Sequence, residues 1–151
     1  MPQLAVLTHA SLGGLSALAA LWVFVEVLNI NESNTGRIGY AVIITLVLVW
    51  GAYLIGGWFY VTHYGADKAI IKAGHWPWAH DFFMEVKEHV FFLILLLATF
   101  LPIVVKRNNL ILNRHARNLA LAVSSMIVLL ALTMEGAGAI ISMGVKQGLL
   151  K

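Results

Sequence analysis

A chain of 151 residues in which 60% are hydrophobic and only 11% are charged is far more apolar than a typical soluble domain. Its net charge of +3 is small and spread over the loops, which gives no support for nucleic-acid binding. The absence of cysteine excludes disulfides, thiolate metal sites, cysteine-ligated iron–sulfur clusters and covalently attached c-type haem. We therefore expect residues 1–151 to form one all-α domain in a lipid bilayer.

Four apolar segments are each long enough to cross the hydrocarbon core of a membrane. They are Leu4–Leu28, Ile38–Val61, Phe82–Val105 and Leu119–Ile141. The connections are short, which favours four antiparallel transmembrane helices in an up-down-up-down bundle.

The connection between the second and third spans, His63–His80, is the longest. Within it Ala66–Ala73 combines apolar and charged side chains, and Gly74 follows, so we expect a short interfacial helix there. Trp76 and Trp78 then lie at the level of the lipid headgroups.

The most basic connection is Lys106–Arg117, with four lysine and arginine residues. The positive-inside rule places such a segment in the cytoplasm, which predicts an inner-membrane protein with both termini outside. The charge difference is small, because the opposite side carries Lys68, Lys72, Lys146 and Lys151.

The third span carries a charged stripe. At about 100° per residue, Asp81, Glu85 and Glu88 fall in one narrow arc with His89 at its edge, while Lys87 points away. Ionisable side chains are costly in hydrocarbon and need pairing, protonation or a ligand. The arc is therefore the expected position of a functional site, with its residues facing the bundle interior.

Ionisable residues of all four spans gather at one end of the predicted bundle. At a rise of 1.5 Å per residue, those of the third and fourth spans reach a similar depth below the same membrane face. The set is His9, His63, Glu88, His89 and Glu135, whereas the other end has only Glu26, Tyr40 and His115. This asymmetry predicts a site near the outer leaflet.

Histidine and glycine positions favour haem b as the ligand. In an up-down bundle the first and third helices are diagonal, so His9 and His89 face each other as two axial ligands. Either His63 or His80 could replace one of them. Glycines near these residues suit the flat walls of a haem pocket, although close helix packing uses glycine equally.

A non-haem metal site is the competing chemistry. Glu85 and His89 are one helical turn apart, and Glu88 and Glu135 could complete a shell for iron, manganese or zinc. A single copper or zinc ion bound by His9, His63 and His89 is also open. The Glu-x-x-His pairs of di-iron bundles are absent.

In its four-span, cysteine-free, histidine-bearing layout the chain looks broadly like the small b-type cytochrome membrane subunits, and the resemblance covers layout alone. With the histidines, it favours an electron-transfer subunit that holds haem b and exchanges electrons with quinone or a partner redox protein. A metal-binding transporter or cofactor-assembly factor for copper, zinc or iron is one alternative. An accessory structural subunit of a larger membrane complex is another. Besides the lipid bilayer, the expected partners are other membrane or redox subunits or a second copy of the chain.

Overall fold

The computed structural model describes residues 2–150, in which all regular structure is helical. The elements are α1 (Pro2–Leu28), α2 (Thr35–Thr62), α3 (Tyr64–Ala73), the π-helix η1 (Ala79–Met84), α4 (Glu85–Arg107) and α5 (Arg114–Leu149). Four helical stretches, the third formed by η1 and α4 together, are long and apolar enough to cross a membrane. This confirms the all-helical class and the four apolar segments. Met1 and Lys151, the latter counted above among the basic residues, lie outside the described residues.

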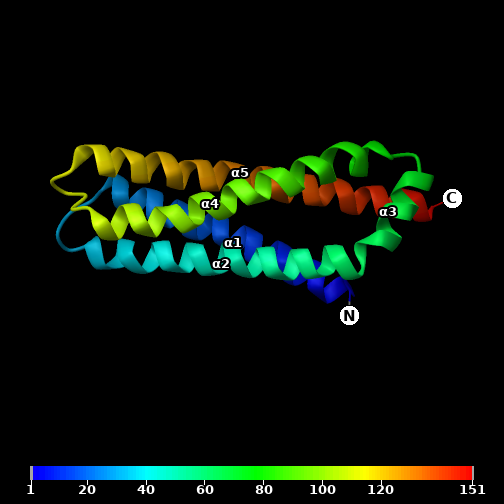
Figure 1. The fold of residues 1–151 in the computed structure, drawn as a ribbon, viewed down its shortest axis with the longest axis horizontal. Helices are drawn as coiled ribbons and strands as arrows, with labels where there is room; N and C mark the ends of the chain where they lie inside the picture. The colour runs from blue at the N-terminus through cyan, green and yellow to red at the C-terminus, as the bar shows by residue number, and fades with distance from the viewer. Residues whose placement is uncertain (1, 151) are drawn as a thin grey trace.

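The four long helices form a ring in which each packs against two others. α1 lies against α2 and α5, and α4 lies against the same two helices, so α1 and α4 are diagonal. The α1–α2 and α4–α5 connections lie at one end of the bundle, and α3 lies at the other end, beside the last turns of α5 (Figure 1).

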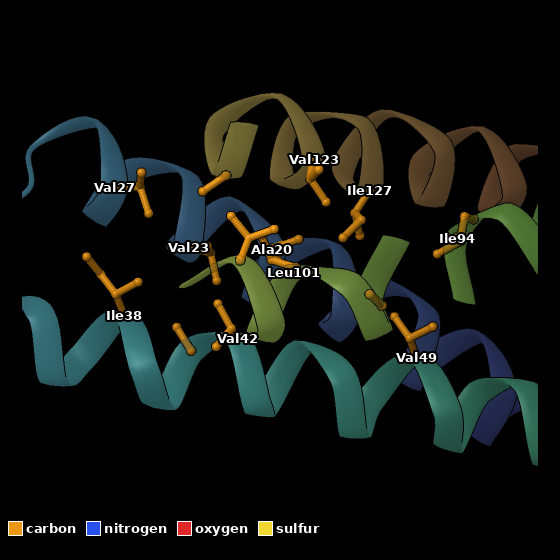
Figure 2. Close-up of a cluster of buried hydrophobic side chains, with 14 of the residues drawn as sticks. Ala20, Val23, Val27, Ile38, Val42, Val49, Ile94, Leu101, Val123 and Ile127 are labelled. Carbon is orange, nitrogen blue, oxygen red and sulfur yellow. The ribbon is translucent and has the colours of Figure 1, made fainter. Parts of the chain in front are cut away.

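A dense apolar core fills the half of the bundle next to the α1–α2 and α4–α5 connections. Side chains from all four long helices point into it, as Figure 2 shows for Val23, Val27, Ile38, Val42, Leu101 and Ile127. The buried hydroxyls of Thr45 and Ser124 donate to carbonyls one turn earlier in their own helices, at 2.9 and 2.8 Å. Their polarity is thus satisfied locally, and this half is held together by packing.

A second, smaller core fixes α3 and η1 onto α5. It is built around Tyr64, Ile71, Ala79 and Ile141. Gly144 of α5 makes this approach possible, because a Cβ at that position would lie 2.9 Å from the Cβ of Ala79. The segment between α2 and α4 is therefore packed against the bundle.

The α1–α2 turn is organised by Asn34, whose side chain is 2% exposed. Its amide nitrogen donates to the backbone carbonyl and the carboxylate of Glu26 at 3.1 and 2.8 Å, and its amide oxygen accepts from the backbone of Asn31 at 2.9 Å. One side chain thus joins the end of α1 to the turn.

We expect Asn34→Ala to lower the midpoint of thermal unfolding in detergent. Each buried partner that loses its hydrogen bond costs about 1–3 kcal/mol. Asn118→Ala is the matched control, because Asn118 is exposed and no hydrogen bond to its side chain is present in residues 2–150. Equal midpoints for the two variants would show that the Asn34 bonds do not stabilise the turn.

Candidate cofactor-binding site

A cavity of about 560 Å³ lies between the two apolar cores, in the half of the bundle that carries α3. Its volume is within the range of small-molecule and cofactor sites. All four long helices line it, together with one residue of α3 and one of η1. The polar lining residues are His9, Tyr53, Tyr60, Asp67, Lys87, Glu88, Glu135 and Ser142.

His9 of α1 is held in a defined orientation at the cavity wall. Its Nδ1 lies 2.8 Å from the carbonyl oxygen of Ala52 in α2. A carbonyl only accepts, so Nδ1 carries the proton of this bond, and in the neutral imidazole Nε2 keeps a lone pair. No hydrogen bond to Nε2 is formed by the described residues, which leaves it available to a ligand.

The His9 ring occupies the place of a missing side chain. A Cβ on Gly56 of α2 would lie 2.6 Å from both Cε1 and Nδ1 of the ring. On the other side, the ring centroid is 6.2 Å from that of Phe91 in α4. Any residue other than glycine at position 56 would displace the imidazole.

Two opposite charges face the cavity from α4 and α5. Lys87 and Glu135 act on each other electrostatically, but they form no ion pair. The ion pairs among residues 2–150 are Arg37–Glu26 and Lys72–Asp81. Lys87 and Glu135 therefore keep hydrogen-bonding capacity for a third group.

Both charged side chains also lie against glycines. A Cβ on Gly138 would be 3.1 Å from Nζ of Lys87, and a Cβ on Gly13 of α1 would overlap the Glu135 carboxylate. Each of the three inward polar side chains, His9, Lys87 and Glu135, thus lies against a glycine of a neighbouring helix, which leaves room for it.

Glu88 supplies a fourth ionisable group. Its Oε1 is buried and has no hydrogen-bond partner among the described residues. The Tyr60 hydroxyl of α2 lies near the same carboxylate. An unpaired buried carboxylate oxygen is costly, and a proton or a ligand donor would remove that cost.

Three of the sequence-predicted site residues, His9, Glu88 and Glu135, come together at the cavity. His89 and Glu85 do not: both are exposed, and Nδ1 of His89 donates to the Glu85 carbonyl at 2.7 Å. The expectation that these two side chains face the interior is wrong. On α4 it is Phe91, not His89, that lies opposite His9.

The other two histidines that were predicted as haem ligands, His63 and His80, do not line the cavity. His63, at the junction of α2 and α3, hydrogen-bonds the Thr62 hydroxyl and stacks on Phe59. His80 is buried in η1, where Nδ1 lies 3.0 Å from the Tyr64 hydroxyl. No cluster of three histidine, aspartate or glutamate side chains suited to a metal ion occurs within residues 2–150, so the predicted metal-ligand sets are not assembled.

Lys87 points inward, contrary to the expectation from the sequence. The buried face of α4 includes Ile94, Ala98 and Leu101, and Lys87 and Phe91 continue that stripe at spacings of three and four residues. The spacing was a usable signal. The acidic residues Asp81, Glu85 and Glu88 lie to one side of this buried stripe. Only Glu88, the nearest of them to the stripe, reaches the cavity.

Tyr53, Tyr60 and Asp67 were missed as well. The two tyrosines resembled interfacial aromatic residues, and Asp67 resembled the polar side of a surface helix. Nothing local in the sequence indicates that the packing of α3 on α5 brings Asp67 to the cavity.

Comparison with protein-family models, curated proteins and solved structures gives no match for this chain.

Asp67 gives a pH-dependent test of the cavity wall. Burial raises the pKa of its carboxyl group. A folded pKa above the unfolded value of about 3.9 means that the folded state holds this proton more tightly, so stability falls as pH rises through that window. We expect Asp67→Asn to raise the thermal midpoint at neutral pH and to have no effect below about pH 4.

Asp81→Asn is the control, since Asp81 is exposed and pairs with Lys72 at 3.1 Å. Asp81→Asn should leave the midpoint of thermal unfolding at neutral pH unchanged or should lower it slightly. A midpoint for Asp67→Asn below that of the unaltered protein at pH 7 would contradict the burial of the Asp67 charge.

Proposed function

We propose that this chain is an integral membrane electron-transfer subunit that binds haem b in the cavity, where Nε2 of His9 would hold the iron. The hydrogen bond from Nδ1 of His9 to the Ala52 carbonyl carries the proposal. Histidines that ligate metals commonly donate the other ring N–H to a carbonyl or carboxylate, which fixes the ring and directs its free nitrogen to the metal. Electrons would be exchanged with quinone or a partner redox protein.

The rest of the cavity fits such a group. Gly56 and Gly138 leave room beside the polar side chains, and the rings of Tyr53 and Phe91, stacked at 5.8 Å, provide an aromatic wall. Lys87 offers an ammonium group to the carboxylates of a haem. When bound, haem supplies one-electron chemistry, and the protein's part is to hold and orient it and to exclude water.

This proposal departs from the His9–His89 pair expected from the sequence. His9 is the only histidine among the described residues that line the cavity. If His9 is the one imidazole that holds the haem, bound haem would show a high-spin absorption spectrum.

We expect haem b to bind the purified protein stoichiometrically, and His9→Ala to abolish its Soret band or convert it to that of unligated haem. Removing the imidazole removes the proposed protein ligand to iron. His89→Ala and His115→Ala, at exposed positions, are matched controls and should retain the spectrum. Gly56→Val should weaken binding by displacing the His9 ring.

Loss of the spectrum in His89→Ala but not in His9→Ala would refute the proposed ligand. A colourless protein that carries stoichiometric copper, zinc or iron would instead favour the metal-binding alternative. If neither haem nor metal binds, the function as an accessory subunit is the one that remains.

The exposed pair Glu85 and His89 favours that second candidate function. Within a membrane-spanning stretch, ionisable side chains in contact with lipid are costly. A neighbouring subunit or a second copy of the chain that covered this face of α4 would remove the cost.

We further propose that the four helices cross an inner membrane in alternating directions, with both termini outside. The end with the α1–α2 and α4–α5 connections carries Lys106–Arg117, and the positive-inside rule places it in the cytoplasm (Figure 1). At the other end α3 buries Tyr64 and Ile71, exposes Lys68 and Lys72, and is followed by the stacked rings of Trp76 and Trp78. A helix of this kind is expected to lie on the outer surface of that inner membrane.

Thiol labelling tests this orientation without background, because the chain has no cysteine. We expect Ala66→Cys, at an exposed position of α3, to react with an impermeant maleimide in intact cells. Asn109→Cys, in the basic connection, should react only after the cells are permeabilised. The reverse pattern would place the cavity near the cytoplasmic leaflet.

A further inference from the structure

A series of polar side chains, each able to donate or accept a hydrogen bond, leads from the cavity to the α3 end of the bundle. It begins at Glu88 in α4, whose carboxylate neighbours the Tyr60 hydroxyl of α2. The Tyr60 ring stacks on Tyr64 of α3, with centroids 5.3 Å apart and an interplanar angle of 21°. The Tyr64 hydroxyl lies 3.0 Å from Nδ1 of His80 in η1. Four different elements thus contribute one residue each.

Tyr64 and His80 are both shielded from solvent, whereas the charged groups beside His80 are not. Tyr64 is 3% exposed and His80 is 2% exposed, while the neighbouring Lys72–Asp81 ion pair is about half exposed on both sides. The charged groups that act on His80 are Lys68 and Lys72 of α3 and Asp81 and Glu85 on its own chain segment. The solvent-exposed ion pair therefore lies at the His80 end of the series, and the cavity lies at the Glu88 end.

We propose that Tyr60, Tyr64 and His80 form a proton-transfer route between the aqueous face at α3 and the carboxylate of Glu88. In the inward direction a hydronium ion protonates His80 at Nε2, and Nδ1 gives up its proton to the Tyr64 oxygen. In the proposed route Tyr64 passes its own proton to Tyr60 through an intervening water molecule, and Tyr60 passes its proton to Glu88. The net change is one carboxylate converted to a carboxylic acid and one hydronium ion converted to water.

Two properties of the residues support this assignment. Burial is the main cause that raises the pKa of Tyr64, so its hydroxyl stays neutral and relays a proton without becoming a stable anion. The buried Oε1 of Glu88 has no partner among the described residues, and a proton on this carboxyl group lowers the cost of its burial. The route does not require haem, although a cofactor in the cavity that gains an electron would use the proton to balance its charge.

Hydrogen–deuterium exchange of the Glu88 carboxylic acid tests the route. The measurement is the infrared carbonyl band, assigned by its loss in Glu88→Gln, in protein reconstituted in lipid nanodiscs without added haem and transferred to D₂O. We expect Tyr64→Phe, which retains the stacked ring, and His80→Gln, which retains a hydrogen-bonding side chain, to slow exchange by roughly tenfold or more, the factor set by a small increase in barrier. Tyr40→Phe, at an exposed position of α2, should exchange at the unaltered rate.

Unchanged exchange in Tyr64→Phe or in His80→Gln overturns the proposal, as does the absence of any carboxylic acid band that Glu88→Gln removes. If exchange at Glu88 is slower in His80→Gln while the midpoint of thermal unfolding equals that of the unaltered protein, His80 acts in proton transfer and not only in the structure. Because no haem is present, failure of haem binding leaves this result unaffected, and failure of the route leaves haem binding unaffected.

Discussion

The cavity depends on the placement of polar side chains opposite glycines. His9 of α1 fills the space at Gly56 of α2, Glu135 of α5 fills that at Gly13 of α1, and Lys87 of α4 lies at Gly138 of α5. These pairs lie at three of the four helix–helix interfaces of the ring, α1–α2, α1–α5 and α4–α5. In a membrane-length bundle an inward charge needs room and a partner, and glycine provides the room without loosening the helices.

The two halves of the bundle differ in how their side chains pack. Near the α1–α2 and α4–α5 connections, branched apolar side chains interlock and the few hydroxyls bond to their own helices. Toward α3 the same helices carry glycines and ionisable groups, and the small core around Ile71 and Ala79 holds α3 and η1 against α5. A densely packed half that fixes the helices allows the other half to keep a cavity.

The sequence was a good guide to the elements and a partial guide to the site. It predicted the four apolar helices, and three of the residues that it proposed for a site, His9, Glu88 and Glu135, line the cavity. It failed on the face of α4, because it took the charged arc as the buried side. Lipid-facing and core-facing positions are both apolar in a membrane protein, so polarity does not distinguish them as it does in a soluble helix.

By itself the sequence determined the helices, since backbone hydrogen bonds within a helix are local and a long apolar segment has no other stable form in a bilayer. It also determined that ionisable residues crowd toward one end. Only the tertiary structure decided which of them share a cavity, because that depends on contacts between distant segments. The His9 imidazole is oriented by a carbonyl 43 residues away, and Lys87 rather than His89 faces inward because α4 packs its Ile94–Ala98–Leu101 stripe against α2 and α5.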